Sequence, residues 1–317
     1  MKIVLAEPLG IKNELLESYA EEVRAKGHTF VAYKDRPANI EALCDRVRDA
    51  DAVMIANLPF PGEAVRCAEN LKYIDVAFTG VDHLDVAACK EKGISVSNAS
   101  GYSDVAVAEL AFGLMLNLSR NVLPCDAMIR KGGTKDGLIG TELYNKTLGV
   151  VGTGKIGTAV IRIALAFGMK VTAYSRTVKP ELEALGVRYV SLEELMAESD
   201  IVTLHVPQND STKGLISGEM IGRMKPTAML INTARGPIVD SAALAEALNA
   251  GKIAAAGIDV FETEPPIAAN HPLLTAKNTL LTPHVAFATT EALERRAKIV
   301  FDNLAAWLQG EVLNKIC

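Results

Sequence analysis

The sequence predicts an α/β protein made of two parallel-sheet units, with the second unit inserted into the first. The chain has 317 residues, which is enough for two domains of ordinary size. Short apolar runs alternate with longer helical patterns almost throughout, as in parallel strands joined by helices. A final helical pattern follows the second series and could run back to the first unit.

The first unit begins at the N-terminus with five short apolar runs that have the length and composition of buried strands. Helical patterns separate these runs, so each pair of strands has a helix to connect it. The expected strands are 2–6, 29–32, 52–56, 73–77 and 94–96, and the expected helices are 12–26, 40–48, 62–69 and 84–92.

The second series starts after a glycine-rich loop at 132–140 and has the same alternation. The stretch 105–120 before this loop is apolar nearly all round, so we expect it to be buried in a core or a subunit interface. The helix 290–309 carries its charge on one face. The strands expected here are 147–151, 170–174, 188–190, 201–204, 228–231, 254–258 and 279–281, with helices that include 155–167, 192–198 and 241–250.

Composition excludes several classes of protein. A hydrophobic fraction of 49% excludes intrinsic disorder, and a net charge of -5 disfavours a nucleic-acid partner. No apolar run reaches the ~18 residues of a membrane span, so no membrane partner is expected. The N-terminus has one basic residue and a short apolar run followed by Glu7 and Pro8, so we expect a first strand there and not a signal peptide. The five cysteines form no CxxC pair, which predicts free thiols in a reducing cytoplasm and neither a disulfide framework nor a zinc site. They are Cys44, Cys67, Cys89, Cys125 and Cys317.

A GxGxxG motif directly follows a valine-rich strand and opens a helix, the context in which this motif indicates dinucleotide binding. Gly152 would allow the tight turn, Gly154 the approach of the pyrophosphate, and Gly157 the close packing of helix on strand. The backbone N–H groups of Lys155 and Ile156 would then point at phosphate oxygens.

The second strand of this unit ends without the acidic residue that usually holds the ribose of NAD. Ser175, Arg176 and Thr177 stand there instead. A 2′-phosphate could accept charge-assisted hydrogen bonds from Arg176, so we expect NADP(H) to be preferred. In the alternative, Arg176 only stacks on the adenine and the site accepts NAD(H) without preference.

Three polar residues follow strands of the second series, where ligands of open α/β sheets bind. They are Arg235, Glu264 and His284. An arginine can bind the carboxylate and carbonyl of a 2-keto acid, a histidine can donate a proton, and a carboxylate can raise the pKa of that histidine. His205 is a less favoured candidate for the acid, because its place suggests a wall of the nicotinamide site.

These motifs, in this order, resemble the D-isomer-specific 2-hydroxyacid dehydrogenases over nearly the whole chain. The resemblance implies a Rossmann dinucleotide-binding domain at 99–287, inserted into a flavodoxin-like substrate domain at 1–98 and 288–317. It also implies an oxidoreductase that forms homodimers through the Rossmann domain. The motifs are 79–85, 102–109, 148–157, 204–207, 232–237, 257–265 and 283–292.

The resemblance assigns catalysis to Arg235, Glu264 and His284, and the nicotinamide carboxamide to Asp259. Thr79 and Gly80 would hold the substrate carboxylate through backbone N–H groups, with Tyr102 beside it. The expected dinucleotide contacts are Gly152, Gly154, Lys155, Ile156, Gly157, Ser175, Arg176, Thr177, His205, Val206, Pro207, Thr212, Thr233, Ala234, Asp259 and Ala286.

The substrate stays open among glyoxylate, hydroxypyruvate and pyruvate. Ser175 and Arg176 resemble the glyoxylate and hydroxypyruvate reductase branch, whereas Tyr102 and Ser103 resemble D-lactate dehydrogenases. Two other classes also stay open. One is a corepressor-like protein that senses the dinucleotide, and the other is a different dehydrogenase of the same fold, such as a phosphite or formate enzyme.

Overall fold

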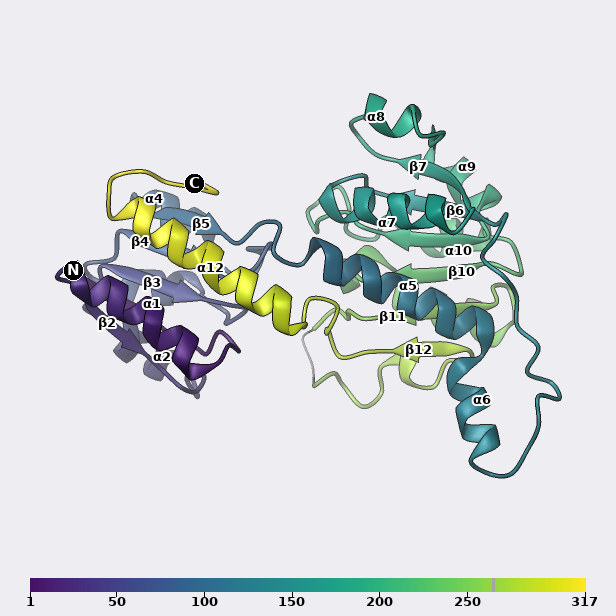
Figure 1. The fold of residues 1–317 in the computed structure, drawn as a ribbon, viewed down its shortest axis with the longest axis horizontal. Coiled ribbons are helices and arrows are strands. Elements are labelled where there is room, and N and C mark those ends of the chain that lie inside the picture. The colour runs from purple at the N-terminus through teal and green to yellow at the C-terminus, as the bar shows by residue number, and fades with distance from the viewer. Residues whose placement is uncertain (264–265) are drawn as a thin grey trace. The chain divides into compact units, whose positions relative to one another are not determined.

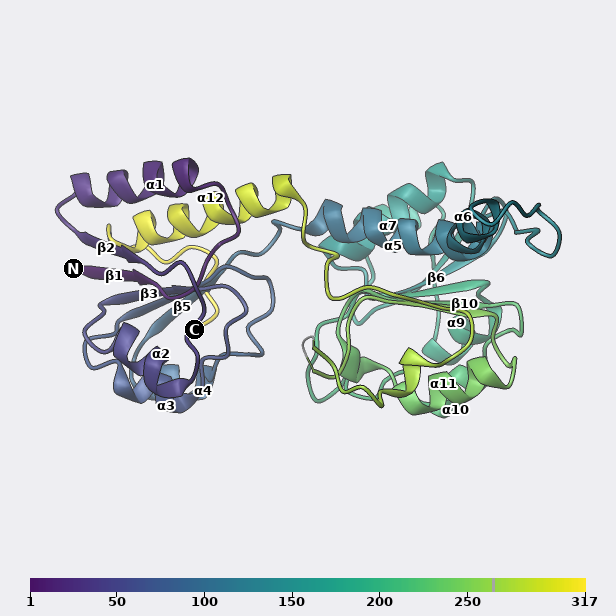
Figure 2. The ribbon, with the colours of Figure 1, turned by 90° about the horizontal axis from the view of Figure 1, so that it is seen from below.

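The computed structural model describes residues 1–263 and 266–317. Its contacts divide the chain into an outer unit, Met1–Ser103 with Ala288–Cys317, and an inserted unit, Asp104–Phe287. The sequence analysis predicted the domain boundaries at 98–99 and 287–288. The predicted fold class is confirmed, because each unit contains a parallel sheet with helices on both faces (Figures 1 and 2).

The outer unit has a five-stranded parallel sheet in the order β2-β1-β3-β4-β5. This is a flavodoxin-like order, whose reversal between β1 and β3 marks a place for ligands at the carboxyl ends of the strands. Helices α1 and α12 cover one face, and α2, α3 and α4 cover the other (Figure 2). The strands are β1 (Lys2–Leu5), β2 (Thr29–Ala32), β3 (Ala52–Ile55), β4 (Tyr73–Val76) and β5 (Ser95–Asn98); the helices are α1 (Asn13–Ala25), α2 (Ile40–Val47), α3 (Gly62–Cys67), α4 (Val86–Glu91) and α12 (Thr290–Trp307).

The last residues of the chain lie along the free edge of β5. Ser97 and Lys315 form an antiparallel bridge, and the N–H of Val96 donates to the carbonyl of Cys317 at 3.1 Å. The N–H of Asn98 donates to the carbonyl of Asn314 at 3.2 Å. The C-terminal segment therefore covers an edge that would otherwise expose unpaired backbone groups.

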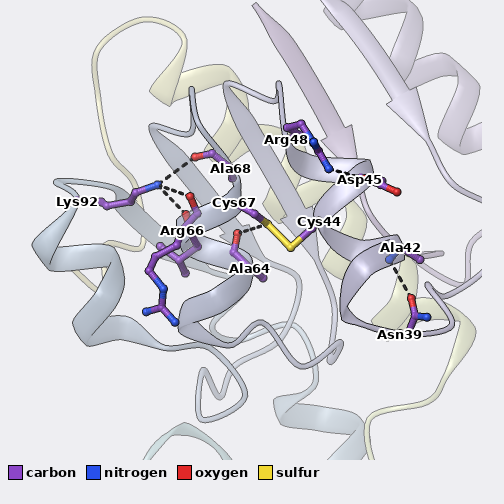
Figure 3. Close-up of a disulfide and its surroundings, with 11 residues drawn as sticks. Asn39, Ala42, Cys44, Asp45, Arg48, Ala64, Arg66, Cys67, Ala68 and Lys92 are labelled. Carbon is purple, nitrogen blue, oxygen red and sulfur yellow. Dashed lines mark hydrogen bonds and ion pairs between the residues drawn. A yellow bond between two sulfur atoms is a disulfide. The ribbon is translucent and has the colours of Figure 1, made fainter.

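The expectation of free thiols is wrong for two of the cysteines. Cys44 of α2 and Cys67 of α3 form a disulfide with their Cα atoms 5.7 Å apart (Figure 3). The pairing depends on two helices packing side by side on one face of the sheet, so motif spacing could not reveal it. Cys89, Cys125 and Cys317 are free, and burial raises the pKa of the Cys89 thiol to about 12.

The inserted unit has a seven-stranded parallel sheet in the order β12-β11-β10-β9-β6-β7-β8. The strand order reverses between β6 and β9, which places a ligand crevice outside the carboxyl ends of these strands. Helices α5 and α7 pack on one face, and α9, α10 and α11 on the other. The strands are β6 (Thr147–Val151), β7 (Lys170–Tyr174), β8 (Arg188–Tyr189), β9 (Ile201–Leu204), β10 (Met229–Asn232), β11 (Ala255–Ile258) and β12 (Thr279–Leu281); the helices are α5 (Asp104–Arg120), α7 (Lys155–Ala166), α9 (Leu192–Glu198), α10 (Gly218–Gly222) and α11 (Ser241–Asn249).

Helix α5 buries one face against α7, β10 and β11, whereas Val105 and Leu116 on it are exposed. Within the described residues, no single helix is long and apolar enough to cross a membrane. Helices α5 and α6 (Val122–Ile129) meet those criteria only as a pair bent by 56°. The sequence patterns did not predict α6 (Val122–Ile129), α8 (Pro180–Glu183), α10 or the 3₁₀ helices Gly236–Ile238 and Pro272–Leu274, since most of these are too short to show periodicity.

Candidate active site

The glycine-rich loop connects β6 to α7 and has the backbone that each glycine permits. Gly152 has φ +97°, and a Cβ there would lie 2.7 Å from the carbonyl oxygen of His205. A Cβ on Gly157 would lie 2.0 Å from the carbonyl oxygen of Gly152. A Cβ on Gly154 would meet nothing within 4 Å, so the backbone is open there. This arrangement fits a pyrophosphate that approaches the loop at Gly154.

The loop lies at the switch point of the seven-stranded sheet. The N–H of His205, directly after β9, donates to the carbonyl of Val151 at the end of β6 at 2.8 Å. The N–H groups of Lys155 and Ile156 belong to the first turn of α7, where the helix offers them no acceptor. After β10, the buried hydroxyl of Thr233 has no hydrogen-bond partner among the described residues. These groups fit a bound dinucleotide.

The residues after β7 supply cations and hydroxyls. The carbonyl of Tyr174 accepts the N–H of Gly152 at 2.8 Å, which ties this strand end to the glycine-rich loop. Ser175 is half-buried, and Arg176 is exposed. The ammonium of Lys179 lies 3.2 Å from Oγ1 of Thr158 in the first turn of α7. The sequence analysis missed Lys179 as a second cation near the loop.

His205 is suited to a wall of the site and not to proton donation. Its Nε2 lies 2.9 Å from Oγ1 of Thr203, and burial lowers its pKa to about 3. An imidazole with that pKa is neutral at physiological pH, so it lacks the acidic second proton that an imidazolium would donate. Farther along the same loop, Oγ1 of Thr212 donates to the carbonyl of Pro207 at 2.6 Å, which closes the turn after β9.

Arg235 follows β10 in a turn shaped by Asn232. Oδ1 of Asn232 accepts the N–H of Ala234 at 3.0 Å, and its Nδ2 donates to the carbonyl of Arg235 at 2.9 Å. A Cβ on Gly236 would lie 1.9 Å from the carbonyl carbon of Phe261, so only glycine permits this contact. The loop with Arg235 thus packs directly against the loop that follows β11.

His284 follows β12 in a left-handed backbone conformation with φ +56°. This conformation is uncommon for residues other than glycine and requires surrounding contacts to hold it. The N–H of His284 donates to the carbonyl of Asp259 at 2.8 Å. The Asp259 carboxylate accepts hydrogen bonds from Oγ1 of Thr282 at 2.6 Å and from the N–H groups of Val285 and Ala286 at 2.9 Å each. Asp259 therefore organises the turn that presents His284.

The Asp259 carboxyl is fully buried, and burial raises its pKa. The expected contact of Asp259 with a nicotinamide carboxamide stays a prediction. Glu264 lies outside the described residues, so its catalytic role also stays a prediction.

The carboxylate of Glu262 lies 2.7 Å from Nε2 of His271. Burial raises the pKa of Glu262, but hydrogen bonds from Ser241 and His271 lower it by a larger amount. The net shift of this pKa is therefore downward.

The expected substrate residues belong to the outer unit. Thr79 and Gly80 form the loop after β4, with Thr79 exposed and Gly80 half-buried. Tyr102 is buried, its carbonyl accepts Nε of Arg295 at 3.0 Å, and its ring lies 5.7 Å from the guanidinium of Arg296. Among the described residues, no group of three or more His, Cys, Asp or Glu side chains could hold a metal ion.

A parallel sheet with a dinucleotide loop at its switch point, an arginine after β10 and a histidine after β12 defines a nicotinamide-dependent oxidoreductase. Residues 112–286 match the family model "D-isomer specific 2-hydroxyacid dehydrogenase, NAD binding domain". The chain belongs to the D-isomer specific 2-hydroxyacid dehydrogenase family.

Named relatives cover most of the chain. A glyoxylate reductase of Korarchaeum cryptofilum is 40% identical over 88% of this chain and 86% of its own length. A hydroxypyruvate reductase of Blautia hydrogenotrophica is 36% identical over 93% of each chain. A solved structure described as an acyclic imino acid reductase in complex with NADPH and D-Arg has a TM-score of 0.90, with 31% identity and full coverage of both chains.

Proposed function

We propose that this chain reduces a small 2-keto acid (glyoxylate, hydroxypyruvate or pyruvate) to the D-2-hydroxy acid. The observation that carries the proposal is the strained His284 turn, held by Asp259 in the sheet whose switch point carries the glycine-rich loop. Strained backbone held by surrounding contacts is typical of functional sites. The names of the relatives support a keto acid as the substrate.

Each candidate residue has a role in this reduction. When bound, the dinucleotide supplies the hydride that adds to the keto carbon. His284 donates the proton that converts the carbonyl oxygen to a hydroxyl, and Glu264 would stabilise the protonated imidazole. Arg235 offers a planar guanidinium to the substrate carboxylate and carbonyl. The N–H groups of the Thr79–Gly80 loop would also hold the carboxylate.

We propose that the reductase prefers NADP(H) over NAD(H). Ser175, Arg176 and Thr177 place no carboxylate after β7 that would repel a 2′-phosphate. Arg176 can donate to that phosphate, and Lys179 adds a second positive charge beside the first turn of α7.

We further propose a homodimer formed through the inserted unit. Exposed apolar side chains gather on α6 and in the loop 132–140 that follows it. An exposed patch of this kind indicates an interaction surface. Val122, Leu123 and Ile129 on α6 and Ile139 in that loop are all exposed. Sedimentation equilibrium at micromolar concentration tests this proposal, and a monomer there contradicts it.

A single assay separates the proposed reductase from its alternatives. The oxidation of NADPH and of NADH is followed with glyoxylate, hydroxypyruvate and pyruvate, and the reduction of NADP⁺ and NAD⁺ is followed with phosphite and with formate. We expect turnover with at least one keto acid. Turnover with phosphite or formate alone identifies another dehydrogenase, and dinucleotide binding without turnover favours a corepressor-like protein.

A further inference from the structure

We infer that Asn98 is a positioning residue for the substrate carboxylate, because its amide orients the Thr79–Gly80 peptide. This inference rests on the proposed function. Asn98 ends β5, and Thr79 lies in the loop that follows the neighbouring strand β4. Nδ2 of Asn98 donates to the carbonyl oxygen of Thr79 at 2.7 Å. No motif in the sequence pointed to Asn98 for this role.

The geometry of the peptide bond connects this contact to substrate binding. In a trans peptide the C=O and the following N–H point in opposite directions. With the Thr79 carbonyl directed at Asn98, the N–H of Gly80 points away from β5. No described residue accepts a hydrogen bond from the N–H of Gly80 or from that of Val81. Successive N–H groups of this kind in a turn form a site for an anion such as a carboxylate.

The backbone of Asn98 is itself hydrogen-bonded to the C-terminal part of the chain. Its carbonyl accepts Nδ2 of Asn303 in α12 at 3.1 Å, and its N–H donates to the carbonyl of Asn314 at 3.2 Å. Nδ2 of Asn314 in turn donates to Oδ1 of Asn303 at 2.8 Å. Asn303 is fully buried, and Asn98 is 7% exposed. The donor that meets Thr79 is therefore held by a hydrogen-bond network whose central residue, Asn303, is buried.

The role requires a donor at position 98. In Asn98→Ala the Thr79 carbonyl loses its partner, and the peptide is free to rotate. In Asn98→Asp a side chain of the same shape presents only acceptors to that carbonyl. Each change weakens a hydrogen bond to a charged substrate group, which corresponds to roughly a tenfold or larger increase in KM for the keto acid. We expect kcat to stay within a few-fold and KM for the cofactor to be unchanged.

The experiment compares wild type, Asn98→Ala and Asn98→Asp in steady-state reduction of glyoxylate. It also measures the binding of oxamate, an unreactive analogue of pyruvate, to the NADPH-loaded protein by calorimetry. Asn39→Ala is the matched control. Asn39 lies in the same unit and accepts the N–H of Ala42 at 2.9 Å as the N-cap of α2, so its loss destabilises the unit without touching the loop. Its KM for glyoxylate should equal that of wild type.

A higher KM for glyoxylate and weaker oxamate binding, in an Asn98 variant as stable as the control, support the inference. A wild-type KM in either Asn98 variant overturns it. Parallel losses in kcat and in cofactor binding, or failure of both variants to fold, show a purely structural role and also overturn it. A wild-type protein that reduces no keto acid contradicts the proposed function, which is a separate outcome.

Discussion

Asp259 holds His284 through its backbone and organises the following residues through its side chain. The carbonyl of Asp259 accepts the N–H of His284 at 2.8 Å, and its carboxylate accepts the N–H groups of Val285 and Ala286. A left-handed histidine costs on the order of 1–3 kcal/mol and persists only where its neighbours define it. The backbone that carries the imidazole is therefore held by a residue that follows a different strand, β11.

We expect His284→Ala to lower kcat by about 10²–10⁴-fold, because a positioned general acid contributes that much to the rate. The glycine-rich loop does not involve this side chain, so the variant should still bind NADPH with wild-type affinity. Stopped-flow single turnovers and fluorescence titration with NADPH measure the two quantities. A variant that turns over within a few-fold of wild type contradicts the assignment of His284 as the acid.

Arg235→Lys keeps the charge at this position but loses the planar fork of donors. We expect KM for the keto acid to rise at least tenfold, while KM for the cofactor changes little. Steady-state kinetics with each ligand varied in turn provides the comparison. Equal losses for both ligands would show that Arg235 shapes the loop after β10 instead of binding substrate.

We expect the cofactor preference to depend on Arg176. Charge-assisted hydrogen bonds contribute ~1.5–3 kcal/mol each, so Arg176→Ala should reduce the preference for NADPH by about tenfold or more. Because Arg176 is exposed, the effect should shrink at high salt. Ser175→Asp should reverse the preference, since a carboxylate binds the ribose diol and repels the 2′-phosphate. A wild type that prefers NADH, with no change in Arg176→Ala, refutes this prediction.

The disulfide of the outer unit closes a loop between residues that are 23 positions apart, Cys44 and Cys67. A cross-link over a loop of this length lowers the conformational entropy of the unfolded chain, and thereby stabilises the folded state by about 3 kcal/mol. Cys44→Ser should therefore lower the free energy of unfolding by that order under oxidising conditions. With excess dithiothreitol, wild type and variant should unfold at nearly the same denaturant concentration, and a difference that persists there argues against the cross-link.

Features with local patterns could be predicted from the sequence, and features made by long-range packing could not. The Gly152 loop was predictable because glycine spacing, the preceding strand and the following helix are all local. The disulfide depends on α2 and α3 lying side by side, and the Asn98–Thr79 contact depends on β4 and β5 being neighbours. The control of the His284 turn by Asp259 likewise joins residues that are 25 positions apart in sequence, after β11 and β12.

Asp75 lies fully buried on β4. Burial raises its pKa well above the usual value, although a hydrogen bond from Nδ2 of Asn303 at 3.1 Å opposes the shift. The unfolded chain ionises this carboxyl near pH 4. The folded state keeps it protonated to higher pH, so the contribution of Asp75 to the free energy of unfolding falls as pH rises through that window, by about 1.4 kcal/mol per pH unit.

Asp75→Asn removes this dependence, because an amide keeps the acceptor for Asn303 and never ionises. We expect the variant to be more stable than wild type at pH 7 and equally stable near pH 4. Urea unfolding followed by the fluorescence of Trp307, the one tryptophan, reports on this unit, since Tyr73 beside Asp75 stacks on it at 4.8 Å. Asp51→Asn is the control of opposite sign, because hydrogen bonds from Lys2 and Lys72 outweigh burial and lower the pKa of Asp51. It should lose stability at pH 7, whereas an Asp75→Asn variant that does the same would show that Asp75 is ionised in the folded protein.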